Sequence, residues 1–191
     1  MQPYPNRLPS YIDISEAYGA RRAVVREFSW AIPTPDAVEA IAKLAPVVEI
    51  GAGTGYWAAL VAGAGGDIVA YDTHPFGTKT DKDGNHYRHD EFLPWFPVQV
   101  GGVEALRRPG NRQTRTLFLC WPPLSKPMAA QCLRAFRGEY VAYIGEGKYG
   151  CTADGKFHRI LDAKWDLVEQ VDLPNWDGLH DGLGIWKRRN T

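Results

Sequence analysis

Two acidic residues flank a glycine-rich run early in the chain. Residues 49–55 read Glu-Ile-Gly-Ala-Gly-Thr-Gly, and Asp72 follows 21 positions after Gly51. Glycines after a strand let the backbone turn sharply and approach a ligand that a side chain would keep away. A carboxylate at the end of the next strand can accept hydrogen bonds from both hydroxyls of a ribose. The spacing therefore predicts a site for an adenosine-containing cofactor.

The glycine pattern separates two classes of cofactor site. A nicotinamide or flavin dinucleotide site needs G-x-G-x-x-G, because the last small residue lets helix and strand pack closely and leaves the helix N-terminus to the pyrophosphate. Here Tyr56 stands at that last position, where its ring would crowd the packing. The pattern E-x-G-x-G-x-G instead resembles the first motif of class I S-adenosylmethionine-dependent methyltransferases. A tight turn without a ligand remains the other reading of these glycines.

The resemblance covers roughly Val47–Arg188 and is clearest from Glu49 to Asp72. In this family the glycine turn cradles the methionine and ribose part of S-adenosylmethionine, which carries no phosphate. Adenine would lie against Gly102 and Val103, although an acidic or amide residue is commoner in the family at the position of Gly102. The wider pattern also resembles methyltransferase-like proteins without an assigned activity. The resemblance implies a cofactor site made of Glu49, Gly51, Ala52, Gly53, Gly55, Tyr56, Asp72, Gly102, Val103 and Cys120.

The segment after the fourth predicted strand, Cys120-Trp121-Pro122-Pro123-Leu124, borders both cofactor and acceptor in this family. Enzymes that methylate planar amino groups carry Asn or Asp, two prolines and an aromatic residue here. This chain keeps only the prolines, so methylation of DNA adenine or protein glutamine is not expected. Trp121 can stack on a substrate or on the sulfonium, or it can pack as core. Cys120 follows Leu119 rather than the proline of cytosine-methylating enzymes, so we expect a buried structural thiol.

A glycine-dense loop, residues 145–152, follows the fifth predicted strand. Such a loop can shape a substrate site, and Glu146 stands where a general base, a cation ligand or a solvated turn acid would lie. Methyl transfer to a good nucleophile depends mainly on positioning. We therefore expect catalysis to involve Glu146 and Trp121. We expect the acceptor to contact Trp121, Pro122, Pro123, Glu146 and Tyr149.

Metal-ligand residue types gather in the segment His86-Tyr87-Arg88-His89-Asp90-Glu91. Two histidines three apart would share a helical face, but the flanks are typical of a loop and a third ligand at a telling spacing is missing. No metal site is expected. His158 is expected on a helix surface and His180 in a turn.

Alternating strand and helix signals surround these residues. Helices are predicted over 35–44, where Thr34 can cap and Pro35 can open the first turn, and over 56–62, 126–136 and 156–161. Strands are predicted over 47–50, 67–72, 97–100, 116–120, 140–144, 165–173 and 183–188. The last two would form a hairpin, so the final strand is expected to run antiparallel. The pattern predicts an α/β fold, a doubly wound seven-stranded sheet, mostly parallel with an antiparallel C-terminal strand and helices on both faces.

The length of 191 residues fits a single domain, with a Rossmann-like core over 46–191 and a helical or lid segment over 1–45. The charged stretch 16–27 could form a helix within that segment. Tyr11 and Trp30 could fold over the cofactor or simply pack against the sheet.

Charge and cysteine content bound the partners and the compartment. Lysine plus arginine equals aspartate plus glutamate at 22 each, which disfavours a nucleic-acid partner, because such partners need a basic surplus. The arginines at 107, 108, 112 and 115 are expected in a solvated loop. Three cysteines without a C-x-x-C pair favour reduced thiols and a cytoplasmic location. No apolar run approaches the roughly 20 residues that a membrane span needs.

These observations favour an S-adenosylmethionine-dependent methyltransferase that acts on a small molecule or an exposed polypeptide group. The departures at Gly102 and at Cys120-Trp121 keep open a catalytically inactive, methyltransferase-like protein that binds the cofactor or a partner. A dinucleotide-dependent oxidoreductase is the third alternative, which Tyr56 opposes.

Overall fold

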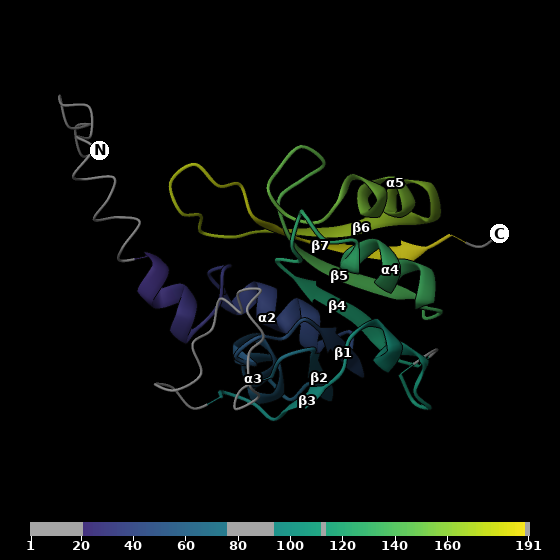
Figure 1. Ribbon diagram of the computed structural model, residues 1–191, viewed down its shortest axis with the longest axis horizontal. Coiled ribbons are helices and arrows are strands. Elements are labelled where there is room, and N and C mark those ends of the chain that lie inside the picture. Colours follow the sequence, from purple (N-terminus) through teal and green to yellow (C-terminus); the bar gives the residue numbers. More distant parts are fainter. Residues whose placement is uncertain (1–20, 76–93, 112–113, 190–191) are drawn as a thin grey trace.

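The computed structural model describes residues 21–75, 94–111 and 114–189, which contain one seven-stranded sheet with helices on both sides (Figure 1). The order of its strands is β3-β2-β1-β4-β5-β7-β6. β7 runs antiparallel to its neighbours β5 and β6, and the remaining pairs are parallel. The predicted fold class is therefore confirmed. The strands are β1 (Val47–Ile50), β2 (Ile68–Asp72), β3 (Val98–Val100), β4 (Thr116–Cys120), β5 (Tyr140–Gly145), β6 (Trp165–Asp172) and β7 (Gly182–Arg188).

The helices begin where local chemistry favours a start. Thr34 caps the first by accepting a hydrogen bond from the Ala37 N–H at 3.2 Å, and Pro35 fixes the first turn, as predicted. Within the expected charged stretch, residues 21–27 are helical. The labelled helices are α2 (Pro35–Ala42), α3 (Tyr56–Gly63), the 3₁₀ helix η1 (Val103–Arg107), α4 (Met128–Ala135) and α5 (Gly155–Lys164).

Alternating residues of the central strands feed two separate hydrophobic layers. On β4, Leu117 and Leu119 pack with α4, α5 and η1 on one face, whereas Phe118 packs with α2 and α3 on the other. A parallel sheet covered by helices on both faces reads as a continuous apolar run, which explains why this strand was recognisable in the sequence. Within the described ranges, no helix has the length and apolar character needed to cross a bilayer.

The strand order reverses between β1 and β4, because the chain proceeds from β1 to β2 and β3 on one side and to β4 and β5 on the other. Ligands of open α/β sheets bind in the crevice beyond the carboxyl ends of the strands at such a switch point. The glycine turn after β1, Asp72 after β2 and Cys120 after β4 all lie at this edge.

Two sequence expectations about charged residues are wrong. His158 is not on the surface of α5 but 7% exposed, because the helix turns this face toward the sheet beside Phe157 and Tyr143. The expectation of a solvated arginine loop is wrong only for Arg115, since Arg107 and Arg108 are exposed. Arg115 is 17% exposed, donates to the Val47 carbonyl at 3.0 Å and pairs with Asp67. Arg112 lies outside the described residues.

Candidate functional site

The glycine turn after β1 needs glycine for its backbone conformation. Gly51, Gly53 and Gly55 have φ of +82°, +54° and +77°, which L side chains rarely adopt. The N–H groups of Gly51 and Ala52 both donate to the Tyr71 carbonyl, at 2.8 and 3.0 Å. These bonds tie the turn to the end of β2 and bring its backbone beside Asp72.

Asp72 is oriented by backbone donors on both sides of its carboxylate. Oδ2 accepts from the Gly53 N–H and Oδ1 from the His74 N–H, each at 2.9 Å. Each carboxylate oxygen has a further lone pair. The side chain is half-buried at the end of β2, so it presents a fixed acceptor pair at the place predicted for a ribose.

Glu49, the acid before the turn, is 2% exposed, and its Oε2 has no hydrogen-bond partner among the described residues. Burial, helped by the nearby negative charge of Asp72, raises the pKa of this carboxyl from 4.5 to about 8. A buried polar atom without a partner costs free energy, so this oxygen is poised to accept a donor from a ligand.

The space beside Glu49 is small in this conformation. A cavity of about 20 Å³ lies between the glycine turn, α3, the end of β4 and residues 28–30 of the N-terminal segment. Sites for cofactors and small molecules usually measure roughly 300–1,000 Å³. The chemistry of the lining fits the cationic, ribose-bearing cofactor implied by the motif, but the volume admits it only if residues 28–30 move. Its lining comprises Phe28, Ser29, Trp30, Glu49, Gly51, Ala52, Tyr56, Trp57, Cys120 and Trp121.

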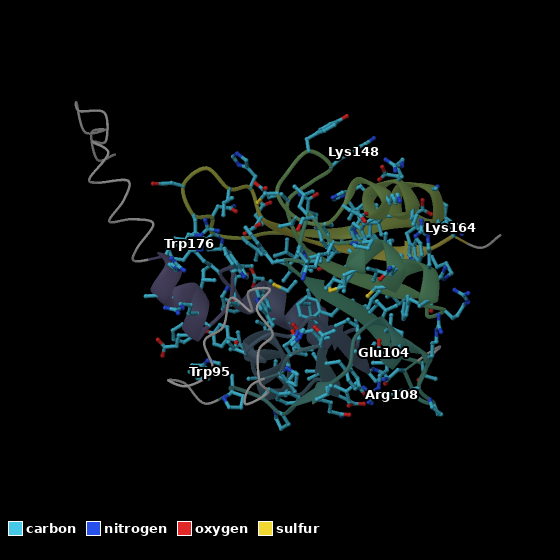
Figure 2. All side chains as sticks on the ribbon, viewed as in Figure 1. Trp95, Glu104, Arg108, Lys148, Lys164 and Trp176 are labelled. Carbon is cyan, nitrogen blue, oxygen red and sulfur yellow. The ribbon has the colours of Figure 1, made fainter. Side chains whose placement is uncertain are left out.

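An aromatic cluster holds the N-terminal segment in this position. The Phe28 ring centroid lies 5.1 Å from that of Tyr56 and 5.2 Å from that of Trp95. The indole of Trp95 donates to the Glu27 carbonyl at 2.8 Å, and the Thr54 hydroxyl donates to the Phe28 carbonyl at 2.5 Å. Tyr56, predicted to touch cofactor, therefore packs edge-on against the chain's own rings (Trp95 is labelled in Figure 2).

Trp121 has a left-handed backbone, with φ of +51°, and its ring stacks on that of Trp30 at 5.0 Å with an interplanar angle of 11°. The guanidinium carbon of Arg21 lies 5.3 to 6.0 Å from the ring centroids of Trp30, Trp121 and Trp176. Trp30 thus reaches the cofactor edge of the sheet, where Trp121 was expected to meet an acceptor. Tyr11, the other residue expected in a lid, lies outside the described residues.

The two prolines after Trp121 contact the loop that follows β5. The Pro122 carbonyl accepts the Ala153 N–H at 2.7 Å, and Pro123 forms an isolated bridge with Thr152. Cys120 is half-buried, and desolvation together with the charges of Glu49 and Asp181 raises the pKa of its thiol well above its usual range.

Glu146 does not have the environment expected of a general base. Burial raises the pKa of its carboxyl, but hydrogen bonds from the backbone N–H groups of Cys151 (2.6 Å) and His180 (2.9 Å) outweigh it and leave the pKa lowered. The side chain therefore connects the loop after β5 with the loop after β6. Tyr149, expected to contact the acceptor, is 95% exposed on the loop that Lys148 marks in Figure 2.

The end of β3 lies beside Asp72, as the adenine prediction requires. The Gly101 N–H donates to the Asp72 carbonyl at 2.9 Å, and a Cβ on Gly102 would lie 3.1 Å from the Thr73 methyl group. The Gly102 N–H is occupied by the Glu104 carboxylate at 2.7 Å, and Val103 is half-buried.

Asp181, which follows a turn and precedes β7, is a residue of this edge that the sequence analysis did not single out. In the structure it is 5% exposed, and neither oxygen has a hydrogen-bond partner among the described residues. Burial raises its pKa, and the neighbouring Trp121 indole and Arg21 oppose that rise, although neither indole nor guanidinium reaches hydrogen-bond geometry.

No group of three or more potential metal ligands gathers within 21–75, 94–111 or 114–189. His86 and His89 lie outside these ranges.

Comparison with known proteins defines the fold. No protein-family model matches the chain, and no curated protein matches its sequence significantly. A magnesium protoporphyrin IX methyltransferase from Synechocystis PCC 6803, solved with bound S-adenosylmethionine, aligns with a TM-score of 0.53 at 10% identity, covering 97% of this chain and 88% of that chain. The 1,6-didemethyltoxoflavin-N1-methyltransferase of Burkholderia thailandensis, solved with its substrate and S-adenosylhomocysteine, aligns at 0.53 and 13% identity, covering 98% and 94%.

An O-methyltransferase from Bacillus cereus, solved with S-adenosylhomocysteine, aligns with a TM-score of 0.51 at 13% identity, covering 96% of this chain and 94% of that chain. All three alignments span nearly the whole of both chains. The sheet of this chain has seven strands in the order β3-β2-β1-β4-β5-β7-β6, with β7 antiparallel. This chain has the fold of the class I S-adenosylmethionine-dependent methyltransferases.

Proposed function

We propose that the chain is an S-adenosylmethionine-dependent methyltransferase acting on a small molecule or an exposed polypeptide group. The observation that carries the proposal is the pairing of two acids across the glycine turn. Glu49 offers a buried oxygen without a partner, and Asp72 offers an oriented carboxylate at the end of the next strand. The three structures compared above have methyltransferase names and contain S-adenosylmethionine or S-adenosylhomocysteine.

Each part of this cofactor has a matching group at the edge of the sheet. Glu49 would accept from the ammonium of its methionine portion, because an ionised donor best satisfies a buried carboxyl. Asp72 would accept from the ribose hydroxyls, and Gly102 and Val103 would flank the adenine. When bound, the cofactor supplies a methyl group on a sulfonium. Trp121, Pro122 and Pro123 remain our candidates for the wall on the acceptor side, and positioning is their role.

The proposal requires the N-terminal segment to open. Residues 28–30 and Trp121 leave about 20 Å³ beside Glu49, so binding must displace at least the stacked pair of Trp30 and Trp121 or the ring of Phe28. Because only the open form binds, the apparent affinity is the affinity of the open form multiplied by the fraction of molecules that are open. Binding is therefore expected to change tryptophan fluorescence.

The first experiment is a calorimetric titration with S-adenosylmethionine, S-adenosylhomocysteine and NAD in parallel. The two sulfur compounds should bind with micromolar dissociation constants and NAD should not. Asp72→Ala should abolish the binding, because the ribose loses its acceptor pair. Asp67→Asn is the matched control, since this exposed acid precedes the opposite end of β2 and pairs there with Arg115. Absence of binding by folded protein would contradict the proposal.

A catalytically inactive, partner-binding protein is the second candidate, and the filled cavity favours it. In that case the aromatic contacts of Phe28 and Trp30 are permanent, and neither sulfur compound changes the tryptophan fluorescence. The same titration therefore separates the two candidates.

A further inference from the structure

Three tryptophans from three parts of the chain lie around one guanidinium at the cofactor edge of the sheet. The Arg21 guanidinium carbon lies 5.3 Å from the ring centroid of Trp30 and 5.6 Å from that of Trp121. The ring centroid of Trp176 is 6.0 Å away. All three distances are within the roughly 6 Å over which an aromatic ring attracts a cation, and a planar guanidinium is suited to contact with flat rings. The tryptophan cluster of Trp30, Trp121 and Trp176 is therefore a cation site that the chain's own arginine occupies.

Arg21 is held in this site without hydrogen bonds from the atoms that are buried there. Its Nε and Nη2 are closed to solvent and have no hydrogen-bond partner among the described residues. The nearby carboxylate of Asp181 is 5% exposed and also lacks a partner within the described ranges. Burial raises the pKa of this carboxyl, and the Trp121 indole and the Arg21 charge oppose that rise. Opposite charges buried near each other without a hydrogen bond leave their desolvation incompletely compensated.

Asp181 also lines a second, larger cavity of about 380 Å³ between α5 and the β5–β7–β6 half of the sheet (Figure 1). That cavity does not supply the missing partner, because both oxygens of the carboxylate are closed to solvent. Neither Arg21 nor Trp121 lines it. The donors nearest to the carboxylate, the Trp121 indole and the Arg21 guanidinium, therefore belong to the cation site and not to the larger cavity.

Only part of the cation site moves with the N-terminal segment. Arg21 lies in the helical stretch 21–27, which leads directly into residues 28–30. Displacing residues 28–30 to admit the cofactor therefore withdraws Arg21 as well. Trp121 and Trp176 stay with the sheet, because the first follows β4 and the second lies between β6 and β7. Opening of the segment thus leaves a cation position without its occupant.

This position adjoins the proposed place of the cofactor. Trp121 lines the smaller cavity together with Glu49 and Gly51 of the glycine turn. Figure 2 shows Trp176 beside the helical stretch of the N-terminal segment, and its indole donates to the Trp30 carbonyl at 3.3 Å. A molecule that contacts Trp121 and Trp176 in the open chain would therefore lie next to the glycine turn.

We propose that the methyl acceptor carries a guanidinium group, and that this group binds against Trp121 and Trp176 at the position that Arg21 occupies in the closed chain. Arg21 is then an internal stand-in for the acceptor, and the closed segment excludes cofactor and acceptor together. A guanidinium that is not fixed to the helix is free to approach Asp181 more closely than Arg21 does. The guanidinium anchors the acceptor, whichever of its atoms receives the methyl group. The inference rests on the proposed function, because the acceptor position opens with the cofactor site.

The first test measures whether the site takes up a free guanidinium. Butylguanidine and butylurea have nearly the same shape, but only butylguanidine is a cation at pH 7. Both are titrated into the full-length Arg21→Ala variant, with tryptophan fluorescence as the readout. The guanidine should bind at least about tenfold more tightly than the urea, since a charge-assisted contact is worth that factor. N-acetylarginine methylamide, titrated in parallel, distinguishes a peptide arginine from a free alkylguanidine as the source of the group.

Arg22→Ala is the matched control, because this exposed arginine is the next residue on the same helical stretch. It should bind butylguanidine no more tightly than the wild type does, since Arg21 still competes. Adding Trp176→Leu to Arg21→Ala should weaken the binding several-fold, because one aromatic face is lost. Arg21→Gln replaces Arg21→Ala if the latter fails to fold.

The second test couples the two sites in the wild-type chain. Saturating S-adenosylhomocysteine should tighten the binding of butylguanidine several-fold, because the same opening removes Arg21. By linkage, butylguanidine should tighten the binding of S-adenosylhomocysteine by the same factor. Equal binding of guanidine and urea by Arg21→Ala, or the absence of coupling in a chain that binds S-adenosylhomocysteine, would overturn the proposal. A chain that does not bind S-adenosylhomocysteine contradicts the proposed function instead, and the comparison of guanidine with urea decides the cation site separately.

Discussion

At the scale of single residues, Glu49 is the group whose protonation the fold changes most visibly at neutral pH. Its pKa is raised from 4.5 to about 8 in the folded chain by burial and by Asp72. Between these values the folded state holds a proton that the unfolded state has released, so this group's contribution to stability falls as pH rises from about 4.5 to about 8. Glu49→Gln, which cannot ionise, should remove that decline.

Urea unfolding at pH 5, 7 and 9 measures this prediction. The variant should gain stability over the wild type as pH rises, reaching roughly 5 kcal/mol at pH 9, since the pKa is raised from 4.5 to about 8 and each pKa unit corresponds to about 1.4 kcal/mol. Glu39→Gln, an exposed acid paired with Lys43 on α2, should keep the wild-type pH dependence. Parallel curves for the wild type and Glu49→Gln would show that this carboxyl does not titrate as described.

The site residues that could be predicted from the sequence depend on local spacing, whereas those that could not be predicted depend on contacts between distant parts of the chain. Gly51, Gly53 and Asp72 were recognisable because a turn with positive φ and an acid one strand later follow from local spacing. The burial of Asp181 and Glu146 could not be predicted, because part of their surroundings comes from distant parts of the chain. Glu146 accepts from His180, 34 residues away, and no local pattern encodes that bond.

At the scale of elements, strands and helices followed from apolar runs, caps and prolines, and their bounds differ little from the predicted ones. The burial of His158 did not follow, because the sequence of α5 does not say how the helix turns on the sheet. The position of residues 28–30 was also beyond prediction. It depends on contacts among the rings of Phe28, Tyr56 and Trp95, which come from three separate segments. The sequence around one aromatic residue does not indicate which other ring it will contact.

That aromatic cluster leads to a prediction about access to the smaller cavity. Each aromatic pair contributes about 0.5–1.5 kcal/mol beyond burial, so Phe28→Ala with Trp95→Ala should loosen the segment and raise the open fraction. Under the proposed function, the apparent affinity for S-adenosylmethionine should rise several-fold, because the closed state competes with the cofactor. Calorimetry measures the change.

Tyr149→Ala is the control for this double variant, since its ring is 95% exposed on a different loop. Its affinity should equal that of the wild type. A fall in affinity for the double variant would mean that the rings contact the bound cofactor instead of excluding it.

At the scale of the whole molecule, one sheet joins two hydrophobic layers and two cavities. The smaller cavity lies where the strand order reverses at β1 and β4, and the larger one lies beside the antiparallel end of the sheet. Asp181 lines the larger cavity and lies near Trp121, which lines the smaller one. A sheet shared by both layers makes it costly to unfold either layer alone.

We therefore expect residues 21–189 to unfold as one cooperative unit, the single domain that the length suggested. Phe118→Ala and Leu119→Ala remove fully buried side chains from opposite faces of β4, one from each layer. Each should destabilise the chain by about 2–5 kcal/mol. For each variant, far-UV circular dichroism and tryptophan fluorescence should give the same urea midpoint, because all probes report the same transition when unfolding is two-state. Two separated transitions in either variant would instead identify the layers as independent units, with each layer lost on its own.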